Sequence, residues 1–400
     1  MNPAATLRST AEIRTRSQFL LSRARAGDSA WFTVHDDAMG TAAAEVADLT
    51  AARFPDLVIP FHSRWRHFEA GGVDRALDLG GLDGPGRARA MIDLTVVSVL
   101  LDAGAGPDWS YREADTGLEL SRSEGLGVAS WHAFTAGTFS SDPGRPLQAD
   151  AAGLRGLDAE TLAAAFQLGP DNPLVGFDGR VDLLRRLGAA LADQPGAFGT
   201  PGRPGGLFDL LVPDPAAPAV AAHDILSALL STMSRIWLAD NVLDGAPLGD
   251  CWRHGAVPGA GATAGWVPFH KLSQWLTYSL LEPFGWAGAP VTGLDALTGL
   301  PEYRNGGLFL DTEVLALRDP GWTDRGWTPA DELVVEWRAL TVALLDELAV
   351  LVRDRLGVSA EQLPLACVLE GGSWAAGRAL AQRLRGGLPP LTVISDGTVF

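Results

Sequence analysis

Segments with a helical spacing of apolar residues, separated by loops rich in glycine and proline, make up most of the chain. They recur at 4–26, 41–54, 85–102, 123–136, 158–167, 177–192, 219–237, 269–283, 329–356 and 371–385. The sequence shows no regular alternation of strands with helices and no internal repeat, so it does not support a parallel sheet. The pattern therefore predicts a mainly α fold with a few short strands, such as 30–37 and 391–395.

The segment 85–102 admits two interpretations. It begins at turn residues and ends at a Gly-Ala-Gly stop, which favours a buried helix with Asp102 at its C-terminal end. Its β-branched run at 95–99 favours a strand instead, after which "DAGAG" would resemble a phosphate-binding loop. A dinucleotide loop needs a third glycine and a clear following helix, and because both are missing here we predict the helix.

The composition suits one large folded unit. Of the 400 residues, 47% are hydrophobic and 20% are charged, and 13 are tryptophans, so the chain can bury an extensive core. No Ser- or Pro-rich linker forces a division into separate domains. We therefore predict a single domain over 1–400, with N-terminal helices in 1–58 and the motif-bearing core in 59–400.

The net charge of −17 is spread along the chain rather than collected in a tail. Such a surface argues against an extended interface with nucleic acid or an anionic membrane, although a local arginine pocket can still hold an anion. We expect a cytoplasmic protein, because there is no signal-peptide pattern and no stretch of 18 apolar residues. Cys251 and Cys367 suggest neither a disulfide framework nor a zinc site, and we expect no metal and no cofactor.

Arginine has displaced lysine throughout the chain except at Lys271, which lies in "VPFHKLSQWLTYSLLEP". We predict a helix here with Pro268 in its first turn and the leucines at 272, 276 and 280 facing the core. The other side of the helix would then carry Lys271, Gln274, Trp275 and Tyr278, with His270 just before them. A solvent-facing polar stripe is the alternative, but the aromatic residues favour a pocket wall.

Three further stretches collect candidate binding or catalytic side chains. "HSRWRHF" carries His62, Arg64, Trp65 and His67, whose spacing favours anion binding by arginine over zinc binding. The stretch 100–126 contributes Asp102, Trp109, Tyr111, Arg122 and Glu124, and "GLPEYRNGGLFLD" contributes Glu302, Tyr303, Arg304, Asn305 and Asp311. A buried ion pair in the first of these two stretches and a plain surface turn in the second are the alternatives.

The residue types in these stretches narrow the chemistry. The chain contains no GxSxG elbow, no phosphate-binding P-loop and no Ser-His-Asp order, which excludes an ordinary serine hydrolase or NTPase. Aromatic side chains, arginines and carboxylates remain. They suit a pocket that stacks a planar group, holds a phosphate and acts at a C–N bond.

These motifs resemble one known family along nearly the whole chain, from about residue 10 to the C-terminus. The family is the uracil-catabolism protein family of fungi and bacteria, of the Urg3 type. The matching stretches are "RWRHFEAGGVDR", "VSVLLDAGAGPDWSYRE", "RSEGLGVAS", "TFSSDP", "NPLVGFDGR", "VPFHKLSQWLTYSLLEP", "LTGLPEYRNGGLFLD" and "PPLTVISDGTVF". The segment 235–245 departs from the pattern expected of the family. The apolar helix ending in Leu-Leu-Asp is also similar to the queuosine-salvage N-glycosylase family, which implies a helical DNA-glycosylase-like fold.

The resemblance implies a place in uracil catabolism, beside a uracil phosphoribosyltransferase and a cyclohydrolase-like enzyme as possible pathway partners. The pathway is thought to attach ribose phosphate to uracil, open the ring and release urea. Our leading hypothesis is a hydrolase that cleaves the N-glycosidic bond of a phosphoribosylated urea or ureido compound. The alternatives are an amide or ureido C–N hydrolase acting before the sugar is removed, and a non-catalytic nucleotide-binding protein.

Under the leading hypothesis, Asp102 or Asp311 would stabilise positive charge at the anomeric carbon. Glu124 or Glu302 would protonate the departing nitrogen. The remaining candidates would bind the substrate: the phosphate at Arg64, Arg304 and Lys271, and the ribose and ureido groups at Trp109, Tyr111 and Tyr303.

Overall fold

The computed structural model describes residues 2–75, 79, 82, 84–214, 216–237, 239 and 241–394. Helices dominate it, which confirms the predicted mainly α fold. The helices are α1 (Pro3–Leu7), α2 (Thr10–Arg25), α3 (Met39–Arg53), α4 (Trp65–Phe68), α5 (Gly84–Leu101), α6 (Arg122–Thr135), α7 (Ala151–Arg155), α8 (Ala159–Ala165), α9 (Phe177–Ala192), α10 (Pro195–Phe198), α11 (Gly206–Leu211), α12 (Ala222–Met233), α13 (Lys271–Trp286), α14 (Tyr303–Asp311), α15 (Glu332–Leu356), α16 (Leu365–Val368) and α17 (Trp374–Arg385).

The strands are short, and each one in the described part of the chain belongs to a two-stranded pair. The antiparallel pairs are β1 (Phe32–Val34) with β10 (Leu315–Leu317), β2 (Ser110–Arg112) with β3 (Glu119–Ser121), β5 (Val242–Leu243) with β6 (Ala246–Pro247), and β7 (Cys251–Arg253) with β8 (Trp266–Pro268). The parallel pairs are β4 (Val220–Ala221) with β9 (Val291–Thr292) and β11 (Gly326–Trp327) with β12 (Thr392–Val393).

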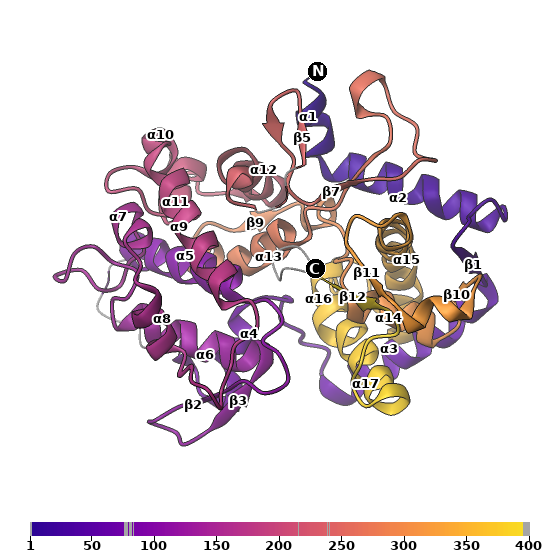
Figure 1. Cartoon of the computed structure of the whole chain (residues 1–400), viewed down its shortest axis with the longest axis horizontal. Helices are drawn as coiled ribbons and strands as arrows, with labels where there is room; N and C mark the ends of the chain where they lie inside the picture. Colours follow the sequence, from indigo (N-terminus) through magenta and orange to yellow (C-terminus); the bar gives the residue numbers. More distant parts are fainter. Residues whose placement is uncertain are drawn as a thin grey trace.

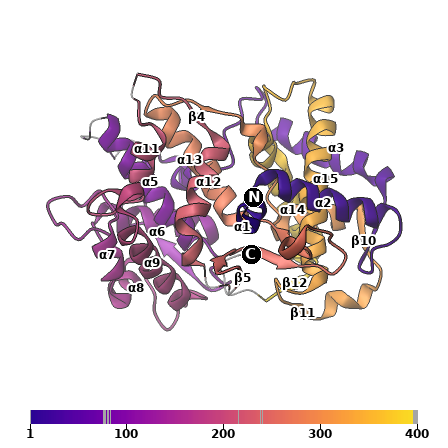
Figure 2. The ribbon, with the colours of Figure 1, turned by 90° about the horizontal axis from the view of Figure 1, so that it is seen from above.

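The helices gather into two sets that lie side by side (Figure 1). Helices α4 to α13 form one set, and α2, α3 and α14 to α17 form the other; the view from above separates the same two sets (Figure 2). Each set is built around one long helix. In the first, α5 packs against α6, α9, α11 and α13, and in the second, α15 packs against α2, α3, α14 and α16.

The central position of α5 follows from its sequence. An unbroken run from Ala90 to Leu101 is buried, so the helix has no polar face to turn toward water. This confirms the predicted helix over 85–102 and excludes the strand at 95–99. The backbone leaves the helix at Asp102, which places this carboxylate at the end of the central helix of the first set.

Several element boundaries differ from the prediction. The first predicted helix is divided into α1 and α2, because the Ser9 side chain accepts a hydrogen bond from the backbone N–H of Glu12 and caps a new helix. Pro268 is not in a helical first turn: it ends strand β8, where it lies opposite Cys251, and α13 begins only at Lys271. Of the predicted strand at 391–395, Thr392 and Val393 form β12, whereas residue 395 lies outside the described residues.

Among the described residues, no helix combines the length and the apolar composition that crossing a membrane requires. The division of the chain into one domain and the glycosylase-like fold stay predictions.

Candidate functional site

A cavity of about 810 Å³ lies between the two sets of helices. The first set contributes the loop 102–107, the start of α6 at 122–124, and residues 175–176 before α9. The second set contributes the start of α14, Glu370, Trp374 and the segment that leads into β12. Lys271 and Trp275 of α13 line it as well, together with His62, Arg66 and His67 of the "HSRWRHF" stretch. The cavity therefore brings together side chains from all four stretches that the sequence singled out.

Asp102 is held on the cavity wall by Arg64. The guanidinium Nη1 lies 3.0 Å from the Asp102 Oδ1, as an ion pair without hydrogen-bond geometry. Arg64 is itself fully buried, and it donates hydrogen bonds to the Ser98 Oγ at 2.7 Å and the Ser123 carbonyl at 3.1 Å. With these bonds made, Arg64 is not part of the cavity lining. Arg64 is therefore placed to orient Asp102. The prediction that Arg64 contacts the phosphate of a substrate is not supported by this position.

His67 lines the cavity beside this pair and is neutral. Burial first, and then the charge of Arg64, lower the pKa of His67 from its ordinary 6.5 to about 3. Its Nδ1 lies 3.1 Å from the Arg64 Nη1. Because a guanidinium can only donate, Nδ1 is the acceptor, and the ring proton must sit on Nε2. His67 therefore offers an N–H donor on the same wall as the Asp102 carboxylate.

Glu302 and Lys271 also line the cavity. Glu302 caps α14, and its two carboxylate oxygens accept the backbone N–H groups of Arg304 and Asn305, each at 2.6 Å. Burial nevertheless raises the pKa of Glu302. The pKa of Lys271 is lowered, again chiefly by burial, although the charges of Glu302 and Asp102 work against the shift. The Lys271 amine makes no hydrogen bond or ion pair with the described part of the chain.

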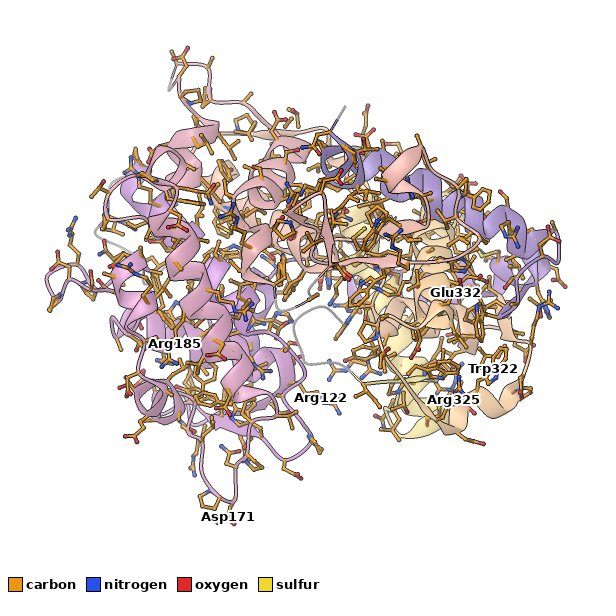
Figure 3. All side chains as sticks on the ribbon, turned by 45° about the horizontal axis from the view of Figure 1, so that its top comes forward. Arg122, Asp171, Arg185, Trp322, Arg325 and Glu332 are labelled. Atoms are coloured by element: carbon orange, nitrogen blue, oxygen red, sulfur yellow. The ribbon has the colours of Figure 1, made fainter. Side chains whose placement is uncertain are left out.

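The lining carries more positive than negative charge, although the chain as a whole is strongly acidic. Its cations are Arg53, Arg66, Arg122, Lys271, Arg304 and Arg378, and its carboxylates are Asp102, Glu124, Glu302 and Glu370. Most of the arginines already bind a carboxylate: Arg378 lies 3.3 Å from Glu124, for example. Arg122 makes no ion pair with any residue that the structure describes. It begins α6, where the side chain of the N-cap residue Ser121 accepts no hydrogen bond from the helix N–H groups, and it projects between the two sets of helices in Figure 3.

Glu370 lines the cavity but was not predicted from the sequence. Glu370 accepts a hydrogen bond from the Nδ1 of His62 at 2.9 Å and pairs with the Arg53 Nη2 at 3.2 Å. Burial alone would raise the pKa of Glu370, but the bond and charge of His62 and the charge of Arg53 lower it overall. Trp374 and Arg378 follow on α17 and were also missed.

A π-helical backbone turn positions Glu370. Residues Leu369–Ser373 form a π-helical turn between α16 and α17, an arrangement that is frequent at functional sites. A Cβ at Gly372 would lie 2.4 Å from the Thr50 Oγ1, so only glycine lets the turn pack this closely on α3. The Gly-Gly pair between Glu370 and Trp374 was the signal in the sequence that could have pointed to this turn.

Four predicted binding residues near α13 and α14 are structural and do not line the cavity. Gln274 donates a hydrogen bond from its Nε2 to the Thr298 Oγ1 at 2.6 Å, and the Tyr278 hydroxyl donates to the Thr298 carbonyl at 2.9 Å. Both side chains are fully buried, so at these two positions the predicted pocket wall is interior packing. His270 binds the Leu7 carbonyl through Nε2, and the Asn305 amide donates to the Leu300 carbonyl.

The structure also removes three aromatic residues and one carboxylate from the predicted site. The indole N–H groups of Trp65 and Trp109 donate to the carbonyls of Ser279 and Phe166, and Tyr111 packs beside His132 with its ring largely buried. Asp311 pairs with the Arg385 Nη2 at 2.6 Å and has 3% of its side chain exposed. All four positions lie outside the cavity lining, so Asp102 is the predicted charge-stabilising carboxylate that remains.

The described part of the chain holds no group of three or more His, Cys, Asp or Glu side chains arranged to bind a metal ion. The buried cysteines Cys251 and Cys367 are not paired with each other.

Trp275 offers a free hydrogen-bond donor on the cavity wall. It is 6% exposed and lines the cavity, and its indole N–H has no acceptor among the described residues.

Comparison with known proteins places the chain in a family. A family model described as "Protein of unknown function (DUF1688)" matches residues 6–400. "Protein urg3" of Schizosaccharomyces pombe is 39% identical over 409 residues, which cover 99% of this chain and 98% of the relative. "Uracil catabolism protein 4" of Lachancea kluyveri is 40% identical over 378 residues, covering 86% and 85%. The chain therefore belongs to the DUF1688 family.

Proposed function

We propose that this protein acts in uracil catabolism as a hydrolase that cleaves the N-glycosidic bond of a phosphoribosylated urea or ureido compound. The names of its relatives support the pathway. The observation that carries the reaction is Asp102, a carboxylate fixed by a buried arginine on the wall of a cavity large enough for a small nucleotide-like ligand.

Cleavage of an N-glycosidic bond develops positive charge at the anomeric carbon and on the ring oxygen. A carboxylate held in a water-poor site stabilises that charge without having to reorganise. Asp102 fits this requirement, since 9% of its side chain is exposed and Arg64 fixes its direction. The departing nitrogen needs a proton, and a carboxyl group whose pKa is raised by burial is better suited to supply one than an exposed carboxyl group. Glu302 is such a group, and it lines the same cavity.

The cationic excess of the lining supports a phosphorylated substrate. Arg122 is well placed to meet a phosphate, because it has no carboxylate partner in the described chain and stands at the positive end of α6. Trp275 supports recognition of a ureido group, since its unpartnered indole N–H can donate to the ureido carbonyl. Tyr303 lies on the rim with 36% of its surface exposed, next to the Arg304 guanidinium.

Two aspartate variants test the proposal. Purified Asp102→Asn and Asp311→Asn are compared for release of urea from a ribosylurea phosphate. Asp102→Asn should lose most of the activity, on the order of a hundredfold or more for a lost transition-state charge interaction. Asp311→Asn should remain active, because it lies outside the cavity and its loss affects only the Arg385 pair.

Three outcomes would contradict the proposal. Full urea release by Asp102→Asn would remove the carboxylate that carries it. Production of a carboxylic acid together with intact ribosylurea, from a longer ureido substrate, would indicate the amide hydrolase. Tight binding of a uridine nucleotide with no turnover would indicate a non-catalytic binding protein.

A further inference from the structure

Lys271 is the only lysine of the chain and the one cation of the lining whose chemistry arginine cannot replace. Its backbone is firmly anchored: the Lys271 N–H donates to the Asp250 Oδ2 at 2.9 Å, and Arg338 binds both oxygens of Asp250 at 2.7 Å. The start of α13 therefore holds the side chain on the cavity wall. Its amine has no partner in the described chain, although three carboxylates, Glu302, Asp102 and Asp250, act on its charge.

A phosphate contact does not explain this arrangement. Arginine is at least as good a phosphate ligand as lysine, because its planar fork binds two oxygens at once. The cavity already holds several arginines, and one of them, Arg122, has no ion-pair partner among the residues described. What lysine offers in addition is an amine that can lose its proton and attack carbon. Burial lowers the pKa of Lys271 and so increases the fraction of the neutral, nucleophilic amine.

We propose that Lys271 is the nucleophile of the reaction and forms an imine with C1 of the ribose phosphate. This inference rests on the proposed function. Its nitrogen forms a bond to C1 while the bond from C1 to the ureido nitrogen breaks, and the leaving nitrogen takes a proton from Glu302. The new secondary amine gives a proton to a cavity carboxylate. The bond from C1 to the ring oxygen then breaks as the nitrogen lone pair forms the C=N bond, and the ring oxygen takes the proton that the carboxylate accepted.

Water completes the cycle. It adds to the imine carbon, the C1–N bond breaks, and Lys271 is released as an amine together with the aldehyde form of ribose phosphate. The sum of the steps is hydrolysis to urea and ribose phosphate, with no oxidant or reductant consumed. The role of Asp102 is unchanged, since it stabilises positive charge at C1 while the two bonds exchange.

The single lysine makes the test unusually specific. The protein is incubated with ribose 5-phosphate, whose open-chain form carries the aldehyde, and the imine is reduced with cyanoborohydride. Mass spectrometry of the intact chain and of its peptides then locates any adduct. Lys271 and the N-terminal amine are the primary amines of the chain. We expect one reduced pentose phosphate on the peptide that contains Lys271, and none there in Lys271→Arg.

Lys271→Arg is the matched variant because it keeps the positive charge and removes the nucleophile. It should unfold at the wild-type urea concentration, and its urea release should fall on the order of a thousandfold or more, as expected for loss of a nucleophile. An adduct confined to the N-terminus, or substantial turnover by Lys271→Arg, would overturn the proposal.

The same experiments separate this inference from the function it rests on. If wild-type protein forms the Lys271 adduct but releases no urea from a ribosylurea phosphate, the proposed function fails and the imine stands. If urea is released in an Asp102-dependent way while no adduct forms and Lys271→Arg turns over, the imine fails and the proposed function stands.

Discussion

Replacing Arg64 by methionine should destabilise the protein strongly, because it leaves the Asp102 carboxylate without its partner. Arg64 is completely buried, and the substitution removes the 3.0 Å ion pair and the 2.7 Å bond to the Ser98 Oγ. Breaking a buried pair from one side costs about 3–5 kcal/mol. Asp102 opens onto the cavity, where water can solvate part of its charge, so we expect about 3 kcal/mol.

A double-mutant cycle measures the coupling. Urea unfolding gives the free energy of unfolding for wild type, Arg64→Met, Asp102→Asn and the double variant. The double variant should be less destabilised than the sum of the single variants by about 1–3 kcal/mol, since it no longer leaves a lone buried charge. Arg145→Met is the control: it breaks the exposed Arg145–Asp142 pair and should cost less than about 1 kcal/mol. Additivity of the two single changes within about 0.5 kcal/mol would refute the argument that Arg64 holds Asp102.

Three further predictions concern other parts of the cavity. Burial holds the pKa of His67 at about 3, so below pH ~6.5 this side chain binds a proton in the unfolded chain but not in the folded chain. The free energy of unfolding should therefore fall as the pH drops toward 3. His67→Gln should flatten this pH dependence, and an unchanged slope would contradict the argument. Arg122→Ala should raise KM for a phosphorylated substrate about tenfold, leave an unphosphorylated analogue unaffected and hardly change the urea midpoint; equal effects on both substrates would argue against a phosphate contact. Gly372→Ala should cost about 1–3 kcal/mol in urea unfolding through its contact with Thr50, whereas Gly40→Ala, which meets nothing within 4 Å, should be neutral or stabilising; similar losses in both would show that the close packing of the turn is unimportant.

The helices could be predicted because their apolar spacing is a local property of the sequence. The segment 177–192 forms α9 with the predicted limits, and the buried run at 90–101 forms the C-terminal part of α5. Pro268 shows where local rules fail. Proline suits the first turn of a helix, but pairing of β8 with Cys251 in β7 holds this proline in a strand, and that partner is distant in the sequence.

The candidate site could be predicted in part. Rare residue types identified the right stretches, but not which side chains in them face the cavity. Gln274 and Tyr278 lie on the same helix as Lys271, yet both reach Thr298, about six turns away along the chain, and are used in packing. Glu370 was missed for the opposite reason: glutamate is common, and its importance comes from His62 and Arg53, which only the fold brings close.

The identity of the bond that breaks is the central claim, and product analysis tests it most directly. A ribosylurea phosphate with an isotope label at the C1 carbon is incubated with the purified protein and followed by nuclear magnetic resonance. We predict that the labelled carbon moves to the resonances of free ribose 5-phosphate as urea accumulates, and that Asp102→Asn stops both changes. A C1 resonance that stays that of a nitrogen-linked sugar, while another part of the substrate is cleaved, would contradict the account.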